Sequence, residues 1–408
     1  MLFALALLQV GALCSEVYVS AETQLPYLTA EDFARAANLQ PALSDGNFSN
    51  SYYTRDNRAL PETKLAWKHA KWDGAVIPYT LDEAFTSEHR AQVAQAMTNY
   101  QSKTCVRFVP RRSTDNDYVH ISRDDKACGL ASLCKEGGRQ IAKFGGSCIT
   151  SGVMSHELGH TLCFMHEQTR PDRDDYISWN TSICTPHEKV DPKDWTTLDL
   201  LYDYVSLQHY EGECYNGCII PKMTGVTKCG SGGTPSVLDI EKINSYYDCQ
   251  GCYSYRFRAK RLISYSANDR LVVAGKGVID EDLYPCRAYH NGDIVPGKGD
   301  SYGSCFVPYN GAEYYKSSNF EVLSNPKGVN LVWRQHPKGS PVPANAIRGG
   351  RTAERETLYI GRCTFTDQKA KKTMTIPGKY HPSASDQLYI PYGGGEYKCE
   401  PFDLLVCQ

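Results

Sequence analysis

The sequence of 408 residues has neither an excess of charge of one sign nor a hydrophobic run long enough to cross a membrane. Its 44 basic and 46 acidic side chains argue against nucleic acid or an anionic membrane as the main partner, because both attract a basic excess. No stretch reaches the roughly 18 consecutive apolar residues of a transmembrane helix, so no transmembrane anchor is expected. A hydrophobic content of 41% excludes a disordered chain and predicts a packed protein.

Cysteine, by contrast, is abundant, with 17 residues, whereas cytosolic proteins of this size usually carry fewer unless they bind metal. Residues 1–15 contain an apolar run of the length of a signal peptide, although no Lys or Arg precedes it. Removing Cys14 with this segment leaves an even number of cysteines, which favours a secreted, extracellular protein with disulfides. Asn47 and Asn180 begin two N-glycosylation motifs, which predict a glycoprotein.

The chain divides into a polar segment and two domains. Residues 16–58 lack cysteine and show little periodicity, as either a linker or a removable pro-segment would, and we interpret them as a pro-segment with basic cleavage points at Arg55 and Arg58. Residues 59–252 mix the signals of helices and strands in the manner of an α+β domain. Its expected elements are strands at 75–81, 106–110 and 118–121, and a helix that Ser87 caps, with Val93, Ala94, Met97 and Tyr100 at helical spacing.

Residues 253–408 contain an internal repeat of four short blocks in the same order. Short apolar blocks separated by Gly and Pro turns predict an all-β domain built from two similar halves. Ten cysteines lie in the region from Cys105 to Cys249 and six in the region from Cys252 to Cys407, so each domain can close its own disulfides. The matching blocks are LYPCR (283–287) with LYIGR (358–362), PGK (296–298) with PGK (377–379), VPYNGAEY (307–314) with IPYGGGEY (390–397), and FEVL (320–323) with FDLL (402–405).

The motif His156-Glu-Leu-Gly-His160, followed by His166, indicates a zinc site. Residues four apart share one face of a helix, so His156 and His160 can bind the same ion, with His166 as the third ligand. Three protein ligands leave one position open, as catalytic zinc requires. Glu157 is turned away from the ion and can act as general base toward a water that attacks a carbonyl group. A third histidine at this spacing makes a chance match improbable.

The segment HELGHTLCFMHEQTRPDRDDY (156–176) resembles the signature of the astacin family of zinc endopeptidases, within the metzincins. WDGAVIPYT, KTCVRFVPR and LDIEKINSYYDC extend the resemblance over about residues 72–249. The resemblance implies a two-lobed α+β domain with a mixed sheet, an active-site helix at the floor of a cleft, one Zn²⁺ per chain, and protein or peptide substrates. It implies that Tyr210 stabilises the oxyanion and that Glu167 pairs with the N-terminal amine released by pro-segment removal. It further implies the disulfides Cys105–Cys249 and Cys128–Cys148.

The chain departs from the family pattern at Cys163, where the family has glycine, and at Gln208, where it has methionine. The turn out of the helix favours glycine, and another residue there costs about 1 kcal/mol. We expect a disulfide to Cys134 to hold Cys163, with a Cys163 thiolate on the zinc as the alternative. Gln208 brings an amide that needs partners, so altered stability is expected more than zinc loss. The F-x-G-D motif of family pro-segments is absent, and Asp45 is the closest candidate to block the zinc.

The repeated blocks resemble the tandem DM-nine repeat of secreted invertebrate lectins and natterin-like toxins. The resemblance implies a β-rich domain of two pseudo-symmetric halves, with binding of mannose-type glycans in some members. A lysine donor and a carboxylate acceptor beside aromatic rings suit sugar hydroxyls, although turn chemistry alone can also explain why the blocks recur. The candidate carbohydrate-binding residues are Asp280, Lys298, Glu313, Lys379 and Glu396.

Three functions fit these residues. The favoured one is a secreted zinc endopeptidase that carries a carbohydrate-binding module, because the three histidines, Glu157 and Tyr210 are all present. The alternative is a weak or inactive protease shell that acts mainly as a glycan-binding protein, which Cys163 and Gln208 keep open. A zinc hydrolase of small molecules is the third, and it would need a closed pocket.

Overall fold

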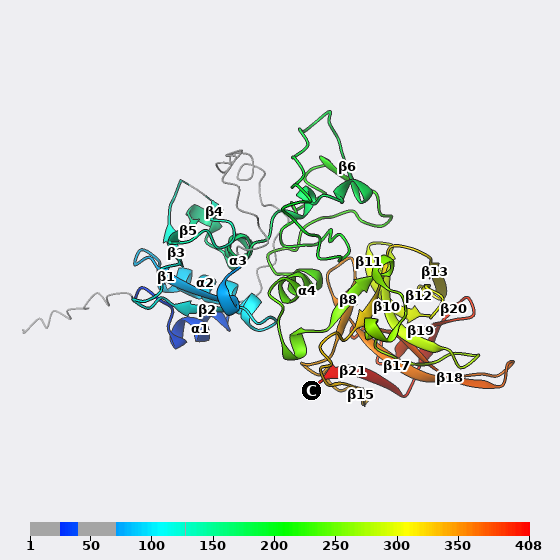
Figure 1. Ribbon diagram of the computed structural model, residues 1–408. Helices are drawn as coiled ribbons and strands as arrows, with labels where there is room; N and C mark the ends of the chain where they lie inside the picture. The colour runs from blue at the N-terminus through cyan, green and yellow to red at the C-terminus, as the bar shows by residue number, and fades with distance from the viewer. Residues whose placement is uncertain (1–24, 40–70, 127) are drawn as a thin grey trace, which may run out of the picture.

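The computed structural model describes residues 25–39, 71–126 and 128–408, and Figure 1 shows their arrangement. The expected signal peptide, Asp45, Asn47, Arg55 and Arg58 lie outside these residues. An α+β region at the left of the view stands beside an all-β region at the right, as the sequence predicts. Within the described ranges, no helix is long and apolar enough to cross a membrane.

The first region contains a five-stranded mixed sheet in the order β2-β1-β3-β5-β4, in which only the edge strand β4 is antiparallel to its neighbour. Ile77, Val119 and Ala142 are fully buried in its core together with side chains of helices α2 and α3. The bounds are β1 Val76–Leu81, β2 Arg107–Pro110, β3 Tyr118–Arg123, β4 Gly129–Ala131, β5 Arg139–Phe144, α2 Ser87–Gln101 and α3 Ser151–Thr161.

The predicted cap of α2 is wrong by one residue. Thr86 is the N-cap, because its backbone is extended and its hydroxyl accepts a hydrogen bond from the amide of His89. Two adjacent hydroxyl residues make the position ambiguous in the sequence. The strand expected at 75–81 begins at Val76, since Ala75 belongs to a 3₁₀ turn with positive φ.

Part of the segment interpreted as a pro-segment is a helix docked on the α+β region. Helix α1 (Ala30–Ala36) packs on α2, and Asp32 forms a buried ion pair of 2.8 Å with Arg90. Arg90 also donates to the carbonyls of Leu25 and Tyr27. The sequence analysis missed this helix because its seven residues are too few to show a period, and its charged partner lies 58 positions away.

The second lobe of the α+β region has little regular structure. It contains the short strands β6 (Ile177–Trp179) and β7 (Ile219–Pro221) and helix α4 (Val237–Tyr246). Tyr202, Tyr204 and Leu238 lie in its buried cluster. Two disulfides, Cys184–Cys218 and Cys214–Cys229, tie the loops together, which compensates for the scarcity of strand pairing.

The all-β region is a 14-stranded sheet whose two halves repeat the same order of strands. Strands β10 to β13 form successive antiparallel pairs, and strands β17 to β20 do the same, which confirms the two similar halves predicted from the repeats. The bounds are β8 Arg256–Ala259, β9 Gly275–Lys276, β10 Asp282–His290, β11 Asp293–Gly299, β12 Cys305–Tyr309, β13 Ala312–Lys316, β14 Phe320–Ser324, β15 Leu331–Gln335, β16 Arg348–Arg351, β17 Thr357–Asp367, β18 Lys372–Tyr380, β19 Leu388–Tyr392, β20 Gly395–Cys399 and β21 Phe402–Cys407.

Disulfides form within each domain, as the even cysteine counts predicted. Five lie between Cys105 and Cys249, and three lie between Cys252 and Cys407. The structure contains the three pairs expected from the resemblance and from the unmatched cysteines, which are Cys105–Cys249, Cys128–Cys148 and Cys134–Cys163.

A buried cluster of charges joins the two domains. Arg287 on β10 is fully buried, donates to both carboxylate oxygens of Glu241 on α4 at 2.8 and 2.6 Å, and reaches Glu321 on β14 at 2.6 Å. Arg351 on β16 pairs with Asp203 at 3.2 Å. Figure 1 shows α4, the last helix of the first domain, next to strand β8 of the second domain. The domains therefore meet through specific buried contacts, which a flexible linker would not provide.

Candidate active site

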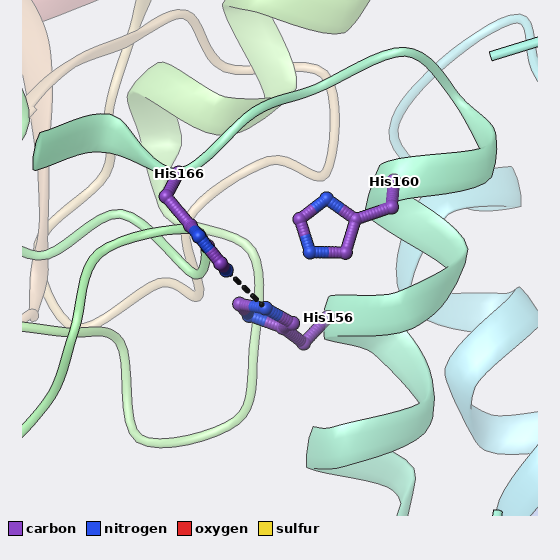
Figure 2. Close-up of side chains that lie close together, drawn as sticks. All are labelled: His156, His160 and His166. Carbon is purple, nitrogen blue, oxygen red and sulfur yellow. Dashed lines mark hydrogen bonds between the residues drawn. The ribbon is translucent and has the colours of Figure 1, made fainter. Parts of the chain in front are cut away.

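Helix α3 and the turn after it bring three histidines together. Thr150 caps α3 by accepting a hydrogen bond from the amide of Val153, and the helix presents His156 and His160 on one face. His166 approaches from the opposite side, with its Nε2 3.2 Å from Nε2 of His156, as Figure 2 shows. One ring nitrogen of each histidine lies within 4.8 Å of the other two, which is the convergence that a metal ion requires.

The outer contacts of the histidines orient the rings for metal binding. Nδ1 of His156 lies 2.7 Å from the carbonyl of Leu207, and Nδ1 of His160 lies 2.7 Å from the carbonyl of Phe164. A proton on each Nδ1 leaves Nε2 with a lone pair for the ion. Burial lowers the pKa of His156 to about 3 and that of His160 to about 4, so the rings are neutral at pH 7. The donor set therefore fits a zinc ion with three nitrogen ligands.

The chain leaves α3 through a left-handed residue at Cys163, as the position of glycine in the family implied. Its φ is +79°, and its sulfur is bonded to Cys134. The disulfide overturns the alternative in which a Cys163 thiolate binds the metal. Tyr246 donates its hydroxyl to the Cys163 sulfur at 3.2 Å, so this bridge also contacts α4.

Glu157 lies beside the histidines and against the edge strand β4. The side chain is buried, and burial raises its pKa to about 8; the positive charge of a bound zinc ion would lower this pKa again and keep the carboxylate ionised. A Cβ placed on Gly129 would lie 2.6 Å from Oε1 of Glu157, so only glycine leaves room for the carboxylate in this position. Gly129 thus positions Glu157, and no feature of the sequence around residue 129 signals this role.

Gly129→Ala is expected to lower kcat for a peptide substrate by about ten-fold, because the added methyl displaces the carboxylate of Glu157. Zinc content should stay unchanged, since the atoms nearest to the added methyl all belong to Glu157 and none to a histidine. Steady-state kinetics with metal analysis of the same samples measure both quantities. Unchanged kcat with full folding would show that Glu157 does not need this space.

The ring of Tyr210 packs edge-on against that of the third histidine. Its ring centroid lies 5.1 Å from that of His166, and burial raises its pKa above the usual value. His187, which the sequence analysis missed, contacts Tyr210 edge-on at 5.1 Å and stacks on Trp179 at 5.5 Å. His187 lies in an irregular segment without a motif, so only the fold brings it to Tyr210.

Similarity to known proteins agrees with this geometry. The family described as Astacin (Peptidase family M12A) matches residues 64–248. High choriolytic enzyme 1 of Oryzias latipes is 34% identical over 192 residues, which cover 45% of this chain and 70% of that protein. The chain belongs to the astacin family.

Further relatives match a similar share of this astacin-family chain. Zinc metalloproteinase nas-4 of Caenorhabditis elegans is 34% identical over 209 residues, covering 49% of the chain and 66% of the relative, and nas-13 is 35% identical over 189 residues, covering 44% and 42%. The chain thus spans only part of the length of these relatives. The solved structure of the Oryzias latipes enzyme has a TM-score of 0.40 at 32% identity, covering 44% of this chain and 94% of that one. The DM9 repeat family matches residues 279–399.

Gln208 replaces the family's methionine below the metal site and forms a direct contact with a ligand residue. Its Nε2 donates to the backbone carbonyl of His156 at 2.8 Å, while its Oε1 is buried without a hydrogen-bond partner among the described residues. A Cβ on Gly159 would lie 2.2 Å from the Gln208 amide nitrogen, so glycine is required there. Only the nitrogen of this buried amide therefore has a hydrogen-bond partner, and its oxygen has none among the described residues.

Glu167, the expected partner of a new N-terminus, is buried among cations. Its Oε1 accepts from Arg170 at 3.0 Å and from the amide of Asp203 at 2.8 Å, and its Oε2 accepts from Lys242 at 2.6 Å. A cavity of about 210 Å³ opens beside it and is lined by Trp195 among others. The pairing of Glu167 with an N-terminal amine stays a prediction.

In the all-β domain, the lysines and glutamates of the two halves form matching pairs. Lys298 lies 2.9 Å from Glu313, and Lys379 lies 3.1 Å from Glu396. Each lysine also donates to a backbone carbonyl of the other half, Lys298 to residue 391 and Lys379 to residue 308. These pairs therefore hold the two halves together, in addition to any contact with a ligand.

An open cavity of about 700 Å³ is lined by the second candidate pair and not by Lys298 or Glu313. Lys379 and Glu396 line it together with Asp293 and His381, which the sequence analysis did not single out. Asp280 lies in a turn between β9 and β10, with a φ of +66°, and does not line this cavity. Asp293 reaches the cavity through the pairing of β11 with β16, and His381 reaches it from the turn after β18. No local sequence motif predicts either placement.

Proposed function

We propose that this astacin-family chain is a secreted endopeptidase that uses one zinc ion to hydrolyse peptide bonds. The observation that carries the proposal is the convergence of His156, His160 and His166 beside the buried carboxylate of Glu157. The zinc, when bound, would polarise the substrate carbonyl and make water a stronger nucleophile. Sixteen cysteines in eight disulfides fit an oxidising, extracellular setting.

The residues around the ion then have distinct tasks. Glu157 takes a proton from the attacking water and passes it to the leaving amine, which is the work of a general base and then a general acid. Tyr210 donates a hydrogen bond from its hydroxyl to the oxyanion that develops on the carbonyl, a role that the contact of its ring with His166 supports. The contacts of His156 to Leu207 and of His160 to Phe164 keep both rings in position.

A peptide blocked at both ends tests the endopeptidase proposal. Mass spectrometry should find internal cleavage of this peptide, because an endopeptidase needs no free terminus. A small-molecule hydrolase would instead cleave only a short ester or amide offered in parallel. A zinc-loaded chain that cleaves neither compound would favour the protease shell that acts as a binding protein.

We also propose that the DM9 region binds mannose-type glycans in the cavity around Lys379 and Glu396. The ammonium of Lys379 and the carboxylates of Glu396 and Asp293 offer donors and acceptors for sugar hydroxyls. Tyr309 and Tyr389 line the same cavity and provide flat apolar faces for a sugar ring. By binding glycans, the DM9 region would hold the endopeptidase close to glycan-bearing substrates.

Glu396→Gln is expected to weaken mannose binding by the full chain about ten-fold, because it removes a charged acceptor from the cavity. Isothermal titration calorimetry measures the affinity. Glu313→Gln, the equivalent change in the other half, is the matched control and should leave this affinity unchanged, since Glu313 does not line the cavity. Equal affinities in both variants and the unsubstituted chain would contradict this sugar site.

A further inference from the structure

A small cavity at the junction of the two domains gathers positive charge. It has a volume of about 150 Å³ and is lined by the start of α4 on one side and by β16 and the beginning of β17 on the other. Four of its lining residues are cationic, and hydroxyl groups of both domains stand among them. The cations are Lys103, Arg348, Arg351 and Arg355, and the hydroxyl residues are Ser231, Thr234, Ser236 and Thr357.

Acidic neighbours balance only part of this charge. Asp203 pairs with Arg351, and Glu211 lies near enough to Arg355 to interact with it. Lys103 and Arg348 have no hydrogen bond or ion pair to any side chain of the described ranges. The four lining cations thus have only two carboxylates, Asp203 and Glu211, as direct partners.

The surroundings of this cavity favour an anion over water. Arg351 is 2% exposed, and its Nε has no hydrogen-bond partner in the described part of the chain. Burial, and then the nearby Arg348, lowers the pKa of Lys103, as expected where positive charges crowd without a counter-ion. Helix α4 begins at the cavity with Val237, and the carboxylate of Asp239 in its capping box already offsets the positive end of the helix dipole, so the excess charge comes from the lining side chains.

We propose that this inter-domain cavity binds a tetrahedral oxoanion, a sulfate or phosphate group, held by Arg348, Arg355 and Lys103. Guanidinium groups bind such oxygens in pairs, and hydroxyls complete the contacts. The cavity is smaller than the roughly 300–1,000 Å³ of sites for drug-sized ligands, so it suits a free ion or the anionic end of a larger molecule. A bound anion would also link α4 of the first domain to β16 of the second.

Calorimetric titration of the full chain with inorganic phosphate and inorganic sulfate at constant ionic strength tests the site. The double variant Arg348→Gln/Arg355→Gln should bind at least about ten-fold more weakly, because two charged contacts are lost. Arg334→Gln is the matched control, since Arg334 is exposed on β15 and is not among the residues that line the cavity. Lys103→Gln provides a second, independent variant if the double variant does not fold.

Monoesters distinguish the sources of the anion. Glucose 6-sulfate binding more tightly than glucose 6-phosphate would assign the site to sulfated glycans, and the reverse order to phosphorylated ligands, with glucose as the neutral control. Either order, lost in the double variant and kept in Arg334→Gln, supports the proposal. Absence of oxoanion binding above that of chloride, or binding that the variants leave unchanged, overturns it.

Discussion

Glu157→Gln is expected to lower kcat for peptide cleavage by about 10²- to 10⁴-fold, the range that a positioned general base contributes. Glutamine keeps the shape of the side chain but cannot take the proton from the attacking water. The residue is not among the three histidines that converge, so zinc binding should persist. Steady-state rates of cleavage of the blocked peptide give kcat, and elemental analysis of the same sample gives the zinc content.

The matched control for this variant is Glu136→Gln. Glu136 lies exposed in the same lobe, in the loop between β4 and β5, and should leave kcat unchanged. Equal, measurable kcat values in Glu157→Gln and the unsubstituted chain would remove Glu157 from the mechanism. Loss of zinc along with activity would instead show that the substitution disturbs the site itself.

Arg287→Met is expected to lower the free energy of unfolding by about 3–5 kcal/mol, because it leaves Glu241 and Glu321 buried without their cation. The three side chains are between 0% and 9% exposed, so water cannot replace the lost contacts. Denaturant unfolding measures the change. Because Glu241 lies on α4 and Arg287 on β10, the variant should also separate one cooperative transition into two.

The chain supplies its own control for this prediction. Arg362 occupies the position of Arg287 in the second repeat, and Asp403 occupies that of Glu321, with a distance of 3.1 Å between them. This pair is about one-third exposed, so Arg362→Met should cost only about 0–1 kcal/mol. If both variants lost the same free energy of unfolding, the contact of Arg287 with Glu241 across the domain boundary would contribute nothing beyond the arginine–carboxylate pair that both repeats contain.

The sequence predicted those parts of the molecule that depend on short-range spacing. The histidines of HELGH share a helix face, and the repeated blocks became matching antiparallel strands, because both patterns are local. The pairing of Cys134 with Cys163 followed from a departure at a single position. Such features need no knowledge of how distant segments pack.

Features formed by segments that are distant in the sequence were not predicted, because no local pattern reports how such segments pack. The sequence shows Arg287 and Glu321 only as members of the repeated blocks. Their burial against Glu241, which makes them part of the contact between the domains, depends on how the domains pack. Gly129 on β4 leaves the space that the side chain of Glu157 on α3 occupies, and no sequence motif marks this glycine. Asp293 and His381 come to one cavity through strand register. The packing of α1 on α2 depends on a buried ion pair that hydrophobic periodicity cannot reveal.

Zinc content measured together with cleavage of the blocked peptide tests the central proposal most directly. The proposal predicts one zinc per chain, loss of cleavage when a chelator removes it, and recovery when zinc is returned. A single preparation, assayed before removal, after removal and after return, gives all three values. Cleavage that persists without zinc, or a folded chain with full zinc that cleaves no peptide, would contradict it.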